Sequence, residues 1–262
     1  QFAKGLDISI PPYFGVVDPG GPYQEKIRAI IEESDVGQLI IKPISGRAGQ
    51  GIALARITEK GVKVKTASRC YELDKFKLTE RSVVQKAVDQ HPIIASIASS
   101  SVNTVRLVTL WTKEDNIILI GAYMRFGQGE SFIDNLSAGG ISVAVDTDKG
   151  VLKQYASDRM GKRFTQHPVS GVVFNNFQIP MWNEVVEMAK VVQKASPFYR
   201  LIGCDVAVTD SGPVLIEANS EPDIVDLEQT CGPILSYKRV YDEFKNYDLL
   251  ISKYQKALYE KS

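Results

Sequence analysis

The sequence has 262 residues, with 31 Lys+Arg balanced by 31 Asp+Glu, so its charge gives no reason to expect nucleic acid or an anionic membrane as a partner. No apolar run approaches the roughly 20 residues that span a bilayer. Three scattered cysteines and two histidines argue against a disulfide framework, a zinc site or histidine-rich metal chemistry, and favour a reducing, cytoplasmic location.

The N-terminal part begins with a Pro- and Gly-rich stretch, residues 1–22, which reads as an extended lead-in or linker. Apolar residues at helical spacing predict an amphipathic helix from Tyr23 to Glu33. Three β-rich runs follow, and they predict strands over 38–43, 52–57 and 62–67.

A glycine-rich loop, residues 45–51, follows the first of these strands, which ends Lys42-Pro43. Such a loop lets backbone N–H groups approach phosphate oxygens, and a lysine just before it adds a point charge. It is not a Walker A loop, because the lysine precedes the glycines. A plain hairpin connection would look similar, so the loop alone leaves both interpretations open.

The middle of the chain predicts a strand from Ser82 to Val88, then a short helix over 92–99. Two long strands are expected at 104–110 and 117–126, and they carry Arg106 and Arg125 among apolar neighbours. A surface ion pair would explain either arginine, but two in one hairpin favour an anion as the partner.

The segment from 131 to 180 predicts a polar, glycine-ended loop at 131–140, a hairpin over 141–155 and a loop-like stretch from 157. A helix is expected from Pro180 to Lys194, and further helix over 236–260.

Between those helices, two β-rich runs flank the turn Asp210-Ser211-Gly212 and predict a hairpin over 202–222. Alternation places Asp205 on one strand and Glu217 and Asn219 on one face of the other. Three hard oxygen donors around one spot are what Mg²⁺ prefers. The alternative is a solvated hairpin with polar residues near its end.

This order of features resembles the ATP-grasp superfamily, and most of all its sugar-transfer-associated members, relatives of the ribosomal-protein glutamate-ligase type. The resemblance covers roughly residues 35–230. It is carried by Val102-Asn103-Thr104-Val105-Arg106, by Asp134-Asn135-Leu136-Ser137-Ala138-Gly139-Gly140, by the stretch from His167-Pro168 to Ile179-Pro180-x-Trp182, and by Glu217-Ala218-Asn219-Ser220-Glu221-Pro222-Asp223.

The resemblance implies an α+β fold in which two lobes grip ATP between antiparallel sheets. It implies a division into a lead-in at 1–22, an N-terminal lobe at 23–88 with the glycine loop, and a C-terminal lobe at 89–262 with the metal site and C-terminal helices.

The resemblance also implies roles for individual residues. Lys42 would hold the α/β-phosphates, Arg125 would stabilise an acyl phosphate or oxyanion, and Arg106 would help to place the phosphates or the substrate acid. One or two Mg²⁺ ions would be held by Asp205, Glu217 and Asn219. The remaining nucleotide contacts would come from the glycine loop (Ser45, Gly46, Gly49, Gly51), the hinge (Gln85, Lys86, Ala87, Val88), the ribose contact Asp89, and the later loop (Asn135, Gly139, Gly140).

Three functions stay open on the sequence. The first is an ATP- and Mg²⁺-dependent ligase that joins a small-molecule carboxylate to an amine through an acyl phosphate. The second is a sugar or polyol kinase on the same fold, with the basic stretch 159–167 as an acceptor site. The third is a non-catalytic nucleotide-binding module.

Overall fold

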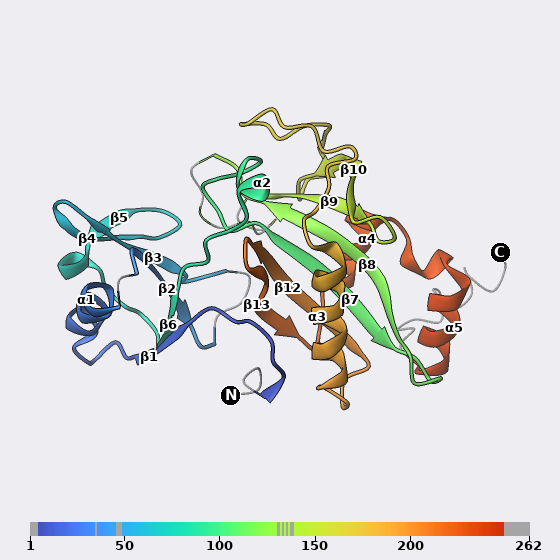
Figure 1. Cartoon of the computed structure of the whole chain (residues 1–262), viewed down its shortest axis with the longest axis horizontal. Coiled ribbons are helices and arrows are strands. Elements are labelled where there is room, and N and C mark those ends of the chain that lie inside the picture. Colours follow the sequence, from blue (N-terminus) through green and yellow to red (C-terminus); the bar gives the residue numbers. More distant parts are fainter. Residues whose placement is uncertain are drawn as a thin grey trace.

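The computed structural model describes residues 5–34, 36–45, 49–129, 132, 134, 136 and 139–248. These residues form two antiparallel sheets, with strand orders β1-β6-β2-β3-β4-β5 and β11-β10-β9-β8-β7-β12-β13. Figure 1 shows the first sheet beside one end of the second.

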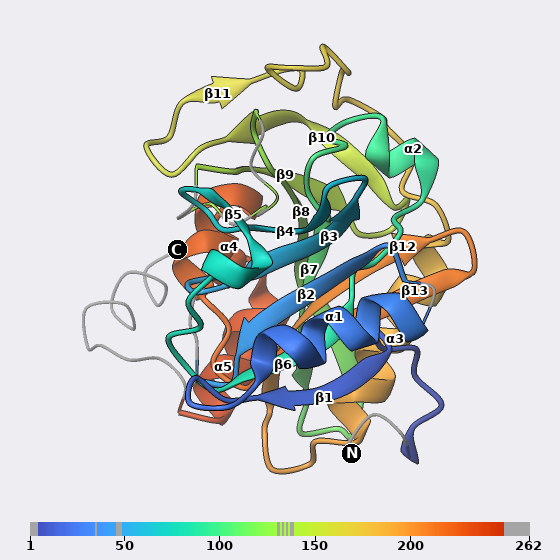
Figure 2. The ribbon, with the colours of Figure 1, turned by 90° about the vertical axis from the view of Figure 1, so that its left-hand side faces the viewer.

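The first sheet is built from short strands with one buried and one half-exposed face, as the alternating burial of β2 illustrates. Its strands are β1 (Tyr13–Val17), β2 (Gln38–Pro43), β3 (Ala53–Thr58), β4 (Gly61–Lys65), β5 (Cys70–Glu72) and β6 (Ser82–Lys86). Helix α1 (Tyr23–Glu33) covers the buried face through Ile27 and Ile31, and lies on the side away from the second sheet (Figure 2). The opposite face is therefore turned toward the second sheet.

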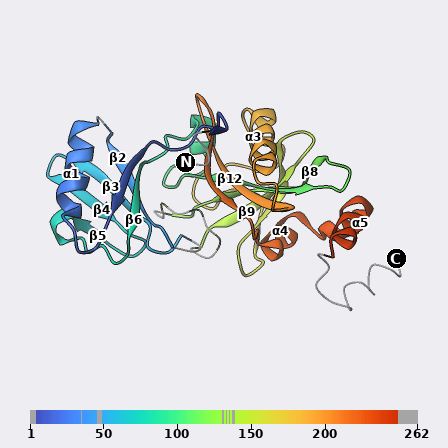
Figure 3. The same ribbon diagram turned by 90° about the horizontal axis from the view of Figure 1, so that it is seen from below.

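The second sheet has almost continuously buried central strands, because helices cover both of its faces. Its strands are β7 (Thr104–Trp111), β8 (Ile117–Phe126), β9 (Ile141–Asp146), β10 (Val151–Ser157), β11 (Arg163–Phe164), β12 (Leu201–Thr209) and β13 (Gly212–Asn219). The helices are α2 (Pro92–Ala95), α3 (Trp182–Lys194), α4 (Ile224–Cys231) and α5 (Lys238–Asn246). Helix α3 lies on one side of this sheet, and α4 and α5 lie on the other (Figure 3).

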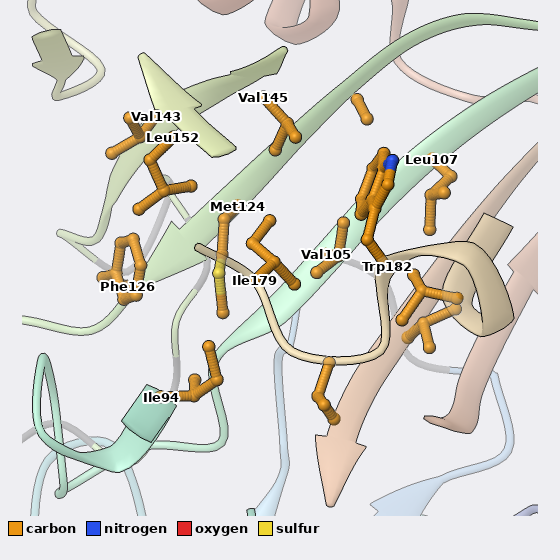
Figure 4. Packing of buried hydrophobic residues seen from close by; sticks show 14 of the residues in the cluster. Ile94, Val105, Leu107, Met124, Phe126, Val143, Val145, Leu152, Ile179 and Trp182 are labelled. Atoms are coloured by element: carbon orange, nitrogen blue, oxygen red, sulfur yellow. The ribbon is translucent and has the colours of Figure 1, made fainter. Parts of the chain in front are cut away.

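The largest core lies under α3, where Trp182, Leu107 and Met124 pack together (Figure 4). The other face carries a smaller apolar cluster under α4 and α5, around Leu227 and Phe244. No helix in the described ranges is long and apolar enough to cross a membrane.

Several expected elements differ from those observed. The predicted lead-in contains strand β1, which pairs with β6, because a strand can form at a sheet edge despite the Gly and Pro around it. Strand β5, the two-residue β11 and helix α4 were not predicted. The expected helix over 236–260 is found as α5, and its part from 249 onward lies outside the described residues.

The division into domains stays a prediction. In the structure, the last strand of the first sheet ends at Lys86, and the next element begins at Pro92.

Candidate functional site

A cleft between the two sheets brings together most of the charged residues that the sequence singled out. Its lining from the first sheet includes Ile40, Lys42, Gln85 and Lys86, and its lining from the second sheet includes Thr104, Arg125, Asp205 and Glu217. Segments that lie 175 residues apart meet here, since Lys42 Nζ lies 3.2 Å from Glu217 Oε2. This ion pair links the end of β2 to β13.

Strand register explains why the polar residues of the second sheet gather. Asp205 on β12 lies opposite Arg106 on β7 and opposite Glu217 on β13. Arg106 in turn lies opposite Tyr123 on β8, and Arg125 is two residues further along that strand. Directly paired residues point to the same face of a sheet, so these side chains form one cluster.

Asp205 is held by both arginines. Arg106 donates from Nε to Oδ1, and from Nη2 to Oδ2 at 2.9 Å; Arg125 donates from Nη2 to Oδ2 at 2.7 Å. Asp205 as a whole residue is only 4% exposed. Burial works to raise the pKa of Asp205, but Arg125 and then Arg106 outweigh it, so this pKa is held below its usual range.

Arg125 is also tied to a second carboxylate through Thr104. Thr104 donates from its backbone N and from Oγ1 to Asp134 Oδ2, at 2.9 and 2.6 Å, and its hydroxyl accepts from Arg125 Nη2 at 2.6 Å. Burial raises the pKa of Asp134, against the opposing effect of Arg125. Within the described residues, Arg125 Nη1 takes part in no hydrogen bond, and the side chain lines the cleft. Its guanidinium can therefore donate to an anion there.

The three predicted metal ligands differ in how they are engaged. Asp205 lies between the two arginines, Glu217 is half exposed, and Asn219 Oδ1 accepts from the backbone N of Glu221 at 2.9 Å. No group of three or more His, Cys, Asp or Glu in the described ranges forms a ready metal cage. The donor set still fits Mg²⁺, because Glu217 and Asn219 are hard oxygen donors on one strand face and Mg²⁺ needs few protein ligands beside phosphates and water.

The predicted nucleotide contacts are partly brought together. Lys42, Gly49, Gln85, Lys86 and Val88 line the cleft. Residues that the structure places outside its lining are Ser45, Gly51, Ala87, Asp89, Gly139 and Gly140. Asp89 instead forms an ion pair with Lys86 at 3.1 Å. Arg106 does not line the cleft either, but it donates to Asp205, which does. Gly46 and Asn135 lie outside the described residues.

Sequence reasoning missed three residues that shape the cluster. Thr104 and Asp134 lie in the sequence stretches that carry the family resemblance, but the sequence predicted no functional role for either residue. Gly203 was also missed: a Cβ there would lie 2.8 Å from Pro222 Cβ and 3.5 Å from Arg106 Nη1. The missing side chain lets Pro222 pack closely against β12, beside Arg106.

Comparison with known proteins gives one family match. The model of the family described as sugar-transfer associated ATP-grasp matches residues 1–235. No curated protein matches the sequence.

Similar solved structures include an ADP complex of N5-carboxyaminoimidazole ribonucleotide synthetase, at TM-score 0.49 and 11% identity, covering 84% of this chain and 43% of that one. The ADP complex of the Staphylococcus aureus N5-carboxyaminoimidazole synthetase matches at TM-score 0.49 and 14% identity, with the same coverage of 84% and 43%. D-cycloserine synthetase matches at TM-score 0.48 and 11% identity, covering 90% of this chain and 66% of that one. This chain thus spans less than half the length of the first two, and likenesses this distant carry no functional argument.

The antiparallel sheets, the cleft between them and a family model that spans residues 1–235 lead to one assignment: the chain belongs to the sugar-transfer-associated ATP-grasp family.

Proposed function

We propose that this protein is an ATP- and Mg²⁺-dependent ligase that joins a carboxylate to an amine. The observation that carries the proposal is the buried cluster at the cleft, where Asp205 and Thr104 orient Arg125 toward the space that Lys42 lines from the other sheet. Two cationic groups facing one cleft from opposite walls suit a reaction between anions, because they offset the repulsion of bringing those anions together.

The proposed reaction has two steps. A substrate carboxylate oxygen attacks the γ-phosphorus of ATP, and the bond to the β–γ bridging oxygen breaks, giving ADP and an acyl phosphate. An amine nitrogen then attacks the acyl carbon, and the amide forms as inorganic phosphate leaves and the nitrogen loses a proton. Arg125 would donate to the oxygens on which negative charge accumulates.

Nucleotide binding would fall to the first sheet and the segment after it. Lys42 would lie at the phosphates, Gln85 to Val88 would contact the base, and the glycine loop would cover the phosphates. Mg²⁺, when bound, would neutralise phosphate charge as a Lewis acid. Glu217 and Asn219 would hold it, and we assign Asp205 chiefly to anchoring the arginines, because both of its oxygens already accept hydrogen bonds from them.

The test is to incubate the purified protein with Mg-ATP, a panel of acids and amines, and hydroxylamine as a trap for acyl phosphates. Mass spectrometry should detect ADP, phosphate and a hydroxamate or amide, and Asp205→Asn should form none of them. A phosphate ester without free phosphate would identify a kinase instead. Nucleotide binding without turnover across the panel would favour a non-catalytic module.

Changing Lys42 to alanine should mainly weaken nucleotide binding. A charge that contacts phosphates in both the ground and transition states affects KM and Kd more than kcat. We expect the Kd for ATP, measured by calorimetry, to rise about tenfold, as loss of one charged hydrogen bond implies. Lys60→Ala, in the turn between β3 and β4, is the matched control. Unchanged ATP affinity would leave Lys42 as a structural partner of Glu217 only.

Changing Glu217 to glutamine should remove the contribution of Mg²⁺ to nucleotide affinity. We expect the gain in ADP affinity on adding Mg²⁺ to fall about tenfold, because one anionic ligand is lost. ADP affinity without Mg²⁺ should not fall, since Lys42 is released from its ion pair. Glu221→Gln, on the exposed segment after β13, is the control. An unchanged Mg²⁺ effect would exclude Glu217 as a ligand.

A further inference from the structure

The segment that precedes β1, residues 8–12, runs between the two sheets and contacts both of them (Figure 1). At one end, Ser9 O accepts a hydrogen bond from the backbone N of Leu215 on β13, at 2.9 Å. At the other end, Pro12 O accepts from the backbone N of Lys86 on β6, also at 2.9 Å. The ligase mechanism proposed above gives this segment no role.

Apolar contacts strengthen the attachment to the second sheet. Ile8 and Ile10 flank Ser9 in the sequence, are half-buried, and pack against the largest core of the protein. The segment thereby covers part of the outer edge of β13, where backbone groups would otherwise be unpaired. This end is therefore held both by a backbone hydrogen bond and by two side chains in the core.

The two attachments are close together along the chain. Ser9 and Pro12 are three residues apart, so even a fully extended backbone between them spans at most about 11 Å. Since β6 and β13 belong to different sheets, the segment limits how far the sheets can separate at this point. Residues 87–91 form a second crossing, in which His91 N donates to Val208 O on β12 at 2.7 Å. Both crossings therefore end on the hairpin of β12 and β13.

Between its two attachments, the segment contributes Pro11 to the nucleotide cleft. Pro11 is buried, and it lines the cleft together with Lys86 and Val88, which we assigned to the base, and with Ile216 of β13. The hydrogen bonds at the two ends of the segment are made to Lys86 and to the residue just before Ile216. A proline has a fixed φ and no backbone N–H, so it presents a rigid apolar surface without a donor to satisfy. Such a surface suits the face of a purine base.

We propose that residues 8–12 act as a positioning strap for the nucleotide. The strap holds Pro11 against the base of a bound nucleotide and ties the two sheets together at that end of the cleft. As a statement about the nucleotide, it rests on the ATP-dependent function proposed above. A strap attached on both sides reduces the freedom that the sheets lose when a nucleotide binds, and such preorganisation raises affinity.

Changing Pro11 to alanine tests the contact with the base. Calorimetry in the presence of Mg²⁺ measures the Kd for ADP and the Kd for inorganic tripolyphosphate, which has phosphates but no base. We expect the Kd for ADP to rise about five- to tenfold, because two methylene groups of apolar contact are lost, and the Kd for tripolyphosphate to change by less than about twofold. Pro19→Ala, at an exposed proline in the turn after β1, is the matched control and should bind both ligands as the wild type does.

Changing Ile8 and Ile10 together to alanine tests the attachment of the strap. Without their core contacts, Ser9 should be released from β13 more often. Hydrogen exchange of the Leu215 amide, followed by NMR, should therefore become about tenfold faster. The Kd for ADP should rise at least as much as in the proline variant, because the strap no longer holds its proline in the cleft.

The control for this pair is Ile57→Ala/Ile93→Ala. It truncates two isoleucines that are each 49% exposed and do not line the cleft. Exchange of the Leu215 amide and affinity for ADP should both match the wild type. A cooperative thermal transition in each variant shows that it is folded.

Wild-type ADP affinity in either strap variant would overturn the proposal. Equal losses of ADP and tripolyphosphate affinity in Pro11→Ala would also overturn it, because they would indicate a general disturbance of the cleft. Since these measurements need no turnover, a failed hydroxamate assay would refute the ligase function and leave the strap standing. Normal hydroxamate formation with ADP affinity unchanged in both strap variants would do the reverse.

Discussion

Replacing Asp205 with asparagine should lower the free energy of unfolding by about 3–5 kcal/mol, which is the usual cost of removing one partner from a buried ion pair. The side chain keeps its volume, but two buried guanidiniums lose their shared counter-charge. Asp134 compensates little, because its Oδ2 lies 3.6 Å from Arg125 Nε and already accepts two hydrogen bonds from Thr104. Urea unfolding followed by circular dichroism measures the change.

The same variant separates two roles for Asp205. If it anchors the arginines, the stability loss should be smaller in the background of Arg106→Met, where one of the two unpaired charges is already gone. If it were instead mainly a metal ligand, stability would change by less than about 1 kcal/mol, and Mg²⁺-dependent ADP binding would be lost. The second result would contradict the anchoring role.

The pH dependence gives an independent check. Because the folded-state pKa of Asp205 is lowered, its stabilisation is fully present above the unfolded value of about 3.9 and is lost as the pH falls through the folded pKa. The stability difference between wild type and Asp205→Asn should therefore be constant near neutral pH and shrink below about pH 4. Asp134, whose pKa is raised, has the opposite dependence, and its contribution differs between the two proteins only by the part of that shift that Asp205 causes.

Much of the fold was predictable because its signals are local. Helix α1 and strands β2 and β8 have the predicted bounds, since each shows a clear apolar period between Gly, Pro or polar breaks. Strand β5 is three residues long, and β1 has a register shift between Tyr13 and Gly15, so neither has enough alternation to be recognised. Their pairing is set by the sheet and not by their own residues.

The candidate site was predictable as a set of residues, but not as a network. Asp205, Arg106 and Arg125 stood out because charges are rare in apolar strands. That Asp205 lies opposite Arg106 depends on the register between β12 and β7, strands about 100 residues apart in the sequence. Thr104 and Asp134 gave no such signal, because a threonine suits any strand and an aspartate suits any polar loop.

Changing Arg125 to lysine should strongly reduce the rate of turnover. Lysine keeps the charge but cannot contact Thr104, Asp205 and an anion in one plane, as the forked guanidinium can. If Arg125 stabilises charge that appears only as phosphate is transferred, kcat should fall about 10²–10³-fold, the usual loss for one oxyanion donor, while KM for ATP changes little. Single-turnover hydroxamate formation measures the chemical step.

The matched control is Arg106→Lys. Arg106 contacts the same carboxylate but does not line the cleft, so its loss should reduce stability without the same loss of rate. Melting temperature and kcat should be measured on one preparation of each variant. If both variants lose stability equally and both keep their rate per folded molecule, Arg125 is a structural partner of Asp205 and Asp134 and does not act on the substrate. A rate loss confined to Arg125→Lys would support its place at the reacting phosphate, because Arg106→Lys weakens the same contact to Asp205.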